Sequence, residues 1–405
     1  MVNIRLKDTG SRSGTAPVWE VRFVNLFRNL LFVVLIIACS TSLWGQASSS
    51  DYEKIKIGDE NSLFSGLDLS PDGNAIVYTE KHSPGIKIID WKSRTLTNEF
   101  HSGAWSGGSK ISYSKGGKYL LRQRMNFVGL IENKVRRIDF EIVEAATGQQ
   151  IKLFEKFQDV VISGDERSIV SLSEAEIVFW NLPDGTRGKS FKVSWAANAI
   201  DLSPDGHILA VSRSVSKEDL AGDSRYEKKK KAIKFAVNDK QMVSLYDAQS
   251  FARIKTTGEL YDIIYNLKFS PDGSQVFVFQ NPTLKAQTSK NAITYINLID
   301  IHSKEPSRFG FTSQAISEPE LKFSKDGKLF AINSKANRFQ EIHLYDLVNG
   351  ALLKRFELGY GLFGKSDGEK YVNDSHPSFT FLPGDQSILI AIGNRMILWN
   401  LELNQ

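Results

Sequence analysis

The chain has 405 residues, of which 41% are hydrophobic and 11% aromatic, so it can bury a sizeable core and is not an intrinsically disordered polymer. Its formal net charge is +5, but residues 1–47 hold five basic and two acidic side chains, which leaves 46 basic against 44 acidic ones in the remainder. This near balance gives no reason to expect nucleic acid as a partner. Cys39 is the only cysteine, which excludes disulfides within the chain and cysteine-ligated metal sites.

Residues 1–47 have the pattern of a signal peptide or membrane-targeting segment. Arg22 and Arg28 precede the apolar run 30–38, and Gly45-Gln46-Ala47 presents small residues of the kind that a signal peptidase reads. The apolar stretch from 30 to 43 has 14 residues, fewer than the roughly 20 that a membrane-spanning helix needs. We therefore expect export across the inner membrane, with a periplasmic, outer-membrane-attached or secreted destination.

Two alternatives to simple cleavage stay open for this segment. A retained membrane anchor would begin near Phe23. Alternatively, Ile36-Ile37-Ala38-Cys39 resembles a bacterial lipobox, in which case the chain would be cleaved before Cys39 and lipidated on it.

One sequence pattern recurs seven times after this segment. It consists of a short apolar strand, a tight turn, a second apolar strand, and a third strand that mostly ends in Asp or Asn. The turns are Ser70-Pro71-Asp72-Gly73, Ser114-Lys115-Gly116-Gly117, Ser163-Gly164-Asp165, Ser203-Pro204-Asp205-Gly206, Ser270-Pro271-Asp272-Gly273, Ser324-Lys325-Asp326-Gly327 and Leu382-Pro383-Gly384-Asp385. In such a turn Pro presets φ, Gly accepts a positive φ, and Ser bonds back to the turn amides. Repeats of this period indicate a solenoid or propeller.

The third strands end in Trp180-Asn181, Tyr246-Asp247, Tyr345-Asp346 and Trp399-Asn400, where WD40 repeats carry Trp-Asp. Together with the turns, these residues resemble the WD40-like β-propeller superfamily, specifically its bacterial Ser-Pro-Asp-Gly or TolB-like repeat type. The resemblance implies an all-β, seven-bladed propeller of four-stranded antiparallel blades over residues 52–405. Its blades would span about 61–100, 104–155, 157–192, 195–256, 260–310, 316–357 and 375–405. The Gly-His pair of eukaryotic WD40 repeats is missing, so their partners are not implied.

The seventh repeat stops before its outer strand, whereas the segment 52–58 alternates polar and apolar residues like a strand and precedes the first repeat. We expect this N-terminal strand to complete blade 7, because closing the ring removes a bare sheet edge.

The repeats differ mainly in the length between their second and third strands. From the first turn residue to the Asp or Asn position the shortest repeats span 18 residues, against 30, 44 and 30 in repeats 2, 4 and 5. In a propeller these connections open on one face, where we expect the function. A short helix within 216–235, with Ser216 at its start and Asp219 three residues on, is expected in the longest insertion.

Basic and aromatic residues gather in these long connections and in that of repeat 6. The candidate binding residues are Arg122, Arg124, Arg136, Arg137, Arg225, Tyr226, Lys228, Lys229, Lys230, Lys231, Lys234 and Arg338. Such a face would attract a protein or an anionic envelope polymer, although long loops also carry lysine simply to stay solvated. We expect a monomeric, non-enzymatic scaffold whose membrane contact is limited to the N-terminal segment.

No catalytic, metal or cofactor site is expected. The chain has no Gly-x-Ser-x-Gly elbow and no phosphate loop, and its six histidines are not spaced as local metal ligands. The alternative function is a propeller enzyme of lactonase or quinoprotein type acting at the central channel. Equivalent inner-strand positions place Asp201 beside Lys268 there, which we interpret as a structural ion pair rather than a ligand site.

Overall fold

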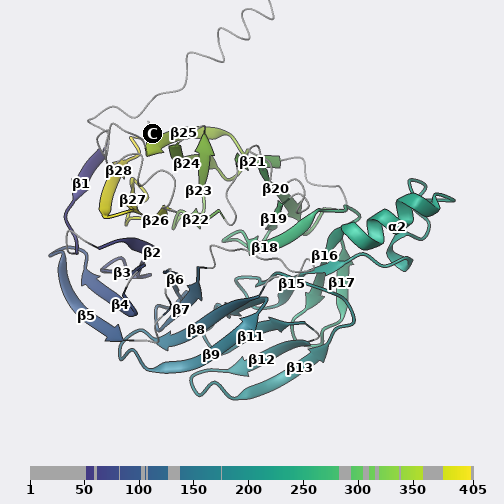
Figure 1. The fold of residues 1–405 in the computed structure, drawn as a ribbon, viewed down its shortest axis with the longest axis horizontal. Coiled ribbons are helices and arrows are strands. Elements are labelled where there is room, and N and C mark those ends of the chain that lie inside the picture. The colour runs from purple at the N-terminus through teal and green to yellow at the C-terminus, as the bar shows by residue number, and fades with distance from the viewer. Residues whose placement is uncertain are drawn as a thin grey trace, which may run out of the picture. The chain divides into compact units, whose positions relative to one another are not determined.

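Seven four-stranded antiparallel sheets follow one another along the chain and surround a common centre (Figure 1). The computed structural model describes residues 52–58, 62–81, 83–101, 105, 108–125, 137–174, 176–281, 293–303, 310–314, 319–336, 339–358 and 377–402. The chain divides into the units Met1–Gly45 and Gln46–Gln405, and every described residue belongs to the second. Within this unit the predicted seven-bladed, all-β propeller is confirmed.

The first four blades are built from consecutive strands. Blade 1 contains β2 (Phe64–Leu69), β3 (Ala75–Glu80), β4 (Gly85–Asp90) and β5 (Thr95–His101). Blade 2 contains β6 (Ser109–Tyr113), β7 (Tyr119–Arg124), β8 (Ile138–Glu144) and β9 (Gln150–Phe157). Blade 3 contains β10 (Asp159–Ile162), β11 (Ser168–Ser173), β12 (Glu176–Asn181) and β13 (Arg187–Lys192). Blade 4 contains β14 (Ile200–Leu202), β15 (Ile208–Ser214), β16 (Gln241–Asp247) and β17 (Arg253–Thr256).

The remaining blades follow the same plan, except that blade 7 takes a strand from the start of the chain. Blade 5 contains β18 (Ile263–Phe269), β19 (Gln275–Asn281), β20 (Ile293–Asp300) and β21 (Gly310–Gln314). Blade 6 contains β22 (Leu321–Phe323), β23 (Leu329–Ala336), β24 (Phe339–Asp346) and β25 (Leu352–Leu358). Blade 7 contains β26 (Ser378–Phe381), β27 (Ser387–Ile392), β28 (Arg395–Asn400) and β1 (Tyr52–Ile55). The described helices are the 3₁₀ turn η1 (Glu218–Leu220) and α2 (Lys230–Asp239).

The core of this propeller is divided among the gaps between neighbouring blades. Each of the seven gaps is filled by its own cluster of buried apolar side chains. Both faces of each blade therefore have to be apolar, which explains why the strands are rich in β-branched and aromatic residues. Between blades 6 and 7, for example, the Phe356 and Trp399 rings stack with their centroids 5.1 Å apart.

The outer strand of blade 7 is β1, as predicted. β1 pairs antiparallel with β28, so that Tyr52 faces Trp399 and Ile55 faces Met396. Ile55 is 5% exposed and packs in the cluster between blades 7 and 1. The two ends of the propeller sequence are thus joined by a backbone ladder and by side-chain packing.

The recurrent turn between the first and second strands has the hydrogen bonds that its residues predict. In blade 1 the Ser70 hydroxyl donates to Asp72 Oδ1 at 2.5 Å and accepts from the Ala75 amide at 2.8 Å. Gly73 adopts φ +80°. These bonds are local, so the turn forms wherever the motif occurs.

Successive turns also contact one another at one end of the propeller. A Cβ added to Gly73 of blade 1 would lie 2.7 Å from Cγ of Pro383 in blade 7. The same proximity of a proline to a turn glycine recurs between blades 1 and 2 (Pro71–Gly117), blades 4 and 5 (Pro204–Gly273), and blades 5 and 6 (Pro271–Gly327). Glycine therefore has a second role here, because it leaves room for the proline of the preceding blade.

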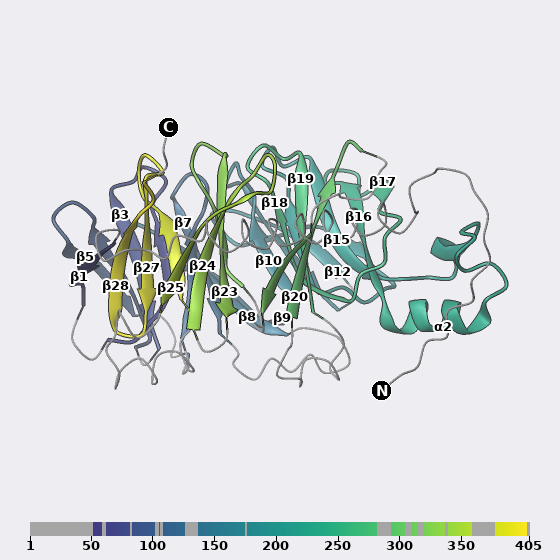
Figure 2. The same cartoon turned by 90° about the horizontal axis from the view of Figure 1, so that it is seen from above.

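Because neighbouring strands of a blade are antiparallel, the connections between second and third strands leave at the end opposite these turns. In blade 4 this connection contains η1 and α2, and α2 lies outside the ring of strands (Figure 1). Figure 2, turned by 90°, shows α2 near the lower ends of the strands. The single helix expected within 216–235 is wrong: a 3₁₀ turn comes first, and the helix begins at Lys230.

Candidate functional site

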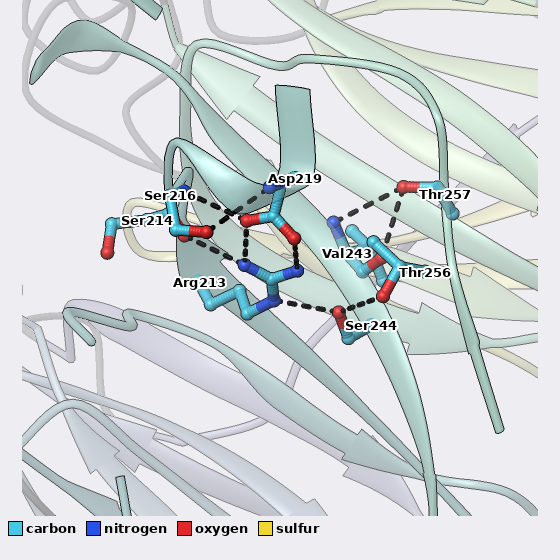
Figure 3. A network of polar contacts seen from close by, with 8 residues as sticks. All are labelled: Arg213, Ser214, Ser216, Asp219, Val243, Ser244, Thr256 and Thr257. Atoms are coloured by element: carbon cyan, nitrogen blue, oxygen red, sulfur yellow. Dashed lines mark hydrogen bonds and ion pairs between the residues drawn. The ribbon is translucent and has the colours of Figure 1, made fainter. Parts of the chain in front are cut away.

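The insertion of blade 4 is fixed at its root by a buried ion pair (Figure 3). Arg213, the penultimate residue of β15, donates through Nη1 and Nη2 to the two carboxylate oxygens of Asp219, both at 2.6 Å. The two side chains are 4% and 10% exposed. A bidentate pair of this kind combines strength with a defined orientation, so it holds η1 against the end of the strand.

The same arginine is tied to the neighbouring strands. Its Nε donates to the Ser244 hydroxyl of β16 at 2.9 Å, and that hydroxyl lies 3.0 Å from Thr256 Oγ1 of β17. Beside them the Thr257 hydroxyl donates to the Val243 carbonyl at 3.1 Å (Figure 3). The guanidinium thus connects the insertion to the third and fourth strands of its blade.

Asp219 is held ionised by these contacts. Hydrogen bonding to Arg213 lowers the pKa of Asp219 to about 2, and the Ser216 amide, at 2.8 Å, adds to the effect. The Asp219 amide in turn lies 3.3 Å from the Ser216 hydroxyl. The expected pairing of Ser216 with Asp219 is therefore present, although it precedes a 3₁₀ turn rather than the helix.

Helix α2 packs one face against the rest of the insertion. Ala236 is buried, and Ile233 and Val237 join it in a cluster with Leu220 and Met242. The spacing i, i+3 and i+4 places these three helix residues on one face. Tyr226, a predicted binding residue, is half-buried against the same cluster.

The exposed part of α2 and the residues just before it are basic. Five of the predicted binding residues lie exposed there: Lys228, Lys229, Lys230, Lys231 and Lys234. None of them forms an ion pair with any residue that the structure describes. Phe235 is 54% exposed beside them. This group of six residues is called the α2 lysine surface below.

Arg122 does not belong to an exposed surface, which corrects its expected role. It lies within strand β7, is 1% exposed, and pairs with Glu141 at 3.2 Å. Its Nε donates to the Ser109 hydroxyl at 2.9 Å, and its guanidinium lies 4.4 Å from the centre of the Trp105 ring. Enclosed in this way, Arg122 stabilises blade 2 and cannot reach a partner at the surface.

Three other predicted arginines are accessible and already paired with carboxylates. Arg124 bonds Asp139 at 2.9 Å, Arg137 bonds Glu174, and Arg225 bonds Asp223 at 2.7 Å. Their side chains are 41%, 51% and 62% exposed. No described hydrogen bond or ion pair joins Arg124 or Arg137 to the α2 lysine surface. Arg136, Arg338 and Cys39 lie outside the described residues.

The central channel contains the expected ion pair and a second one that the sequence did not predict. Lys268 Nζ lies 3.8 Å from Asp201 Oδ1, as the inner-strand positions indicated. Lys322 of blade 6 bonds Asp68 of blade 1 at 2.8 Å, so this pair bypasses blade 7. Glu320, whose Oε1 is 3.8 Å from Lys322 Nζ, accepts a 3.1 Å hydrogen bond from the Ser378 hydroxyl of blade 7.

Burial and pairing have opposite effects on these channel groups. Burial raises the pKa values of Glu320 and Asp201. Burial alone would lower the pKa of Lys322, but attraction to Asp68 and Glu320 outweighs it and the pKa is raised. The channel residues line two adjoining spaces of about 360 and 380 Å³ that share Asp201 and Lys268.

Asp68 and Asp201 also link the blades through their second oxygens. Asp68 Oδ2 accepts from the Tyr113 amide of blade 2 at 2.8 Å, and Asp201 Oδ2 accepts from the Phe269 amide of blade 5 at 2.6 Å. Each of these two carboxylates therefore connects blades through both of its oxygens, which is a structural role.

Across the described parts of the chain, no group of three or more His, Cys, Asp or Glu side chains is arranged to hold a metal ion. Among the same residues, no helix combines the length and the apolar character needed to cross a bilayer.

No protein-family model and no curated protein matches the chain in sequence. Among solved structures, it is similar to the β-propeller domain of Cps50 (Swd1) from Myceliophteria thermophila, with a TM-score of 0.55 and 12% sequence identity. The match covers 86% of this chain and 99% of that domain. At this identity the likeness concerns the fold alone, and it shows that the chain is a seven-bladed β-propeller with a WD40-type structural neighbour.

Proposed function

We propose that this chain is an exported, non-enzymatic scaffold that binds a partner protein at the insertion end of the propeller, the end that carries the long connections between second and third strands. The observation that carries this proposal is the blade 4 insertion. An insertion fixed by a buried Arg213–Asp219 pair is an ordered projection from the ring rather than a loose loop. Ordered insertions on a repeat scaffold are typical of binding surfaces.

The opposite end of the propeller is less suited to a partner. There the turns of successive blades pack against each other, as Pro383 packs against Gly73. Their hydroxyl and carboxylate groups are used within the turns, as in the Ser70–Asp72 bond. This leaves few polar groups for a partner, so the insertion end is the better candidate.

The exposed arginines support a protein as the partner. Arg124, Arg137 and Arg225 all lie at or beside the long connections, their side chains are exposed, and each is paired with one carboxylate. Such pairs contribute little to the stability of the fold, so their arginines can be redirected toward a partner. Arginine is also enriched in protein–protein interfaces relative to other surface.

Export is supported by the sequence of residues 1–47, where Arg22 and Arg28 precede the apolar run 30–38 and small residues follow at 45–47. Mass spectrometry of the protein isolated from cells tests this part. A mature N-terminus after Ala47, or a lipidated Cys39, would support export. An intact N-terminus on a protein recovered only from the cytosol would refute it.

Affinity capture from an envelope extract tests the binding end. We compare the wild type with R124S/R137S/R225S at the insertion end. The control is K92S/K115S/K328S, which removes the same number of positive charges at the opposite end, where the recurrent turns lie. We expect specific partners to be lost from the first variant and retained by the second. Equal recovery of every partner by both variants would refute the proposed surface.

A further inference from the structure

The five lysines of the α2 lysine surface outnumber the acidic residues that flank them in sequence, which are Glu227 before Lys228 and Asp239 at the end of α2. Three other carboxylates of this region are already paired: Asp219 binds Arg213, Asp223 binds Arg225, and Asp262 binds Lys240 at 2.6 Å. From Lys228 to Asn238 the sequence contains no acidic residue. The surface therefore presents concentrated positive charge to the solvent.

This charge is placed where it does not help the helix. Lys230 and Lys231 form the start of α2, and Lys228 and Lys229 directly precede it. The N-terminus of a helix carries the positive end of its dipole, so lysine is unfavourable there and acidic residues are preferred. The first turn of α2 contains no acidic residue, and no side chain caps it. An arrangement that is unfavourable for the fold indicates selection for something outside it.

An exposed aromatic ring accompanies the lysines. Phe235 lies one turn after Lys231 and next to Lys234 in sequence, so the three side chains share the outer side of the helix. On the inner side Ala236 is buried in the cluster with Leu220 and Met242, and Ile233 and Val237 are partly buried against it. The outer side thus combines cationic side chains with one exposed large apolar group.

We propose that the α2 lysine surface binds an anionic phospholipid bilayer, with α2 lying along the lipid headgroups and Phe235 inserted between them. Lysine and phenylalanine on a helix surface are the composition of interfacial helices. Lysine offers a flexible point charge, which suits many mobile phosphates, whereas arginine's rigid fork suits the fixed carboxylates of a protein. The surface contains five lysines and no arginine.

The structure also explains how lipid contact would orient the propeller. The Arg213–Asp219 pair fixes the root of the insertion, and α2 lies outside the ring (Figure 1). A bilayer bound along α2 would therefore hold the blades in one orientation. This proposal goes beyond the proposed protein partner, because the arginines assigned to that partner lie outside the α2 lysine surface. It also departs from the expectation that membrane contact is limited to the N-terminal segment.

Co-sedimentation of the full chain with lipid vesicles tests the proposal. One set of vesicles is made of phosphatidylcholine, and the other contains phosphatidylglycerol as an anionic component. The test variant is K228S/K229S/K230S/K231S, and the control K54S/K56S/K92S/K192S removes the same charge from exposed lysines elsewhere. Vesicles without anionic lipid measure any binding by the rest of the chain.

We expect the test variant to bind anionic vesicles at least about tenfold more weakly than the wild type, since each lysine near an anionic membrane contributes measurably to binding. The control variant should bind like the wild type, and added salt should weaken wild-type binding. K228R/K229R/K230R/K231R should retain binding, and F235S should reduce it. Thermal unfolding should show the test variant to be as stable as the wild type or more so.

Equal binding of the wild type and the test variant to anionic vesicles would overturn the proposal. So would binding to soluble polyphosphate or polyglutamate without binding to vesicles, because the surface would then serve a soluble polyanion. Loss of captured proteins from R124S/R137S/R225S, with vesicle binding unchanged, would support both proposals as separate functions.

Discussion

Glu166 of blade 3 accepts a hydrogen bond from the hydroxyl of Ser114 in blade 2. In five other blades that bond goes to an aspartate of the same turn. Blade 2 has glycine where the aspartate belongs, and Glu166 supplies the missing carboxylate from the next blade. It also accepts from the Gly116 amide at 2.9 Å and the Lys118 amide at 3.2 Å.

Asp385 of blade 7 serves blade 6 in a related way. Its two oxygens accept from the amides of Lys325 and Asp326 at 2.9 and 3.0 Å. Blades 2 and 6 are those whose turns carry Lys115 and Lys325 in the position of proline. Proline has no N–H, whereas the Lys325 amide is one of the two from which Asp385 accepts a hydrogen bond. An acidic residue of the next turn accompanies the lysine in both cases.

Replacing Glu166 should therefore destabilise a neighbouring blade. We expect E166A to lower the free energy of unfolding by about 1–3 kcal/mol, because the Ser114 hydroxyl and two amides lose their acceptor. Urea denaturation measures the change. E166Q keeps one acceptor oxygen and should lose less. A loss for E166A no larger than that for R167A, at the exposed neighbouring residue, would contradict the role of Glu166.

Gly73 and Gly206 separate the two roles of the turn glycine. Both have a positive φ, +80° and +77°, but only at Gly73 would a Cβ meet the neighbouring proline, while at Gly206 nothing lies within 4 Å. G206A should cost about 1–2 kcal/mol from backbone conformation. G73A should cost more, because Pro383 must also move. Equal losses in urea denaturation would show that the contact between turns contributes nothing.

The Arg213–Asp219 pair should control the stability of the insertion. We expect D219N to cost about 3 kcal/mol, since Arg213 would remain buried without its counter-ion. Hydrogen exchange within residues 216–240 reports the loss. The control D223N breaks an exposed pair and should leave the exchange rates of the insertion nearly unchanged. Comparable exchange rates in both variants would mean that Asp219 does not hold the insertion.

The same pair predicts a pH dependence. The folded-state pKa of Asp219 is lowered from 3.8 to about 2, so the pair contributes stability above pH 3.8 and loses it as the pH falls toward 2. Exchange within the insertion should be insensitive to protonation of Asp219 above about pH 4 and should increase below it. D219N should not show this increase in hydrogen exchange at low pH.

Closure of the ring by β1 should be essential for stability. We expect I55D to lower the free energy of unfolding by at least about 3 kcal/mol, because it places a charge in the cluster between blades 7 and 1. I254D makes the same change on the outer strand of blade 4, where the side chain is 56% exposed, and should be nearly neutral. Similar denaturation midpoints for the two variants would argue against closure by β1.

The sequence by itself determined the propeller, the number of blades and the strand that closes the ring. The repeats follow from local chemistry, since the Ser70–Asp72 bond and the positive φ of Gly73 depend on residues within one turn. The closing strand follows because the last repeat lacks an outer strand and the segment 52–58 is left over. The Asp201–Lys268 pair was also predictable, because equivalent positions in neighbouring repeats lie side by side.

Only the tertiary structure decided what depends on residues that the ring brings together from distant repeats. Lys322 reaches Asp68 past an intervening blade, and Glu166 completes a turn some 50 residues away. Burial decided the rest: Arg122 lies enclosed beside Trp105, whereas Lys228–Lys231 remain in solvent at the start of a helix that the sequence did not place there. An arginine in a basic stretch looks the same in sequence whether packing covers it or not, and packing is a property of the assembled blades.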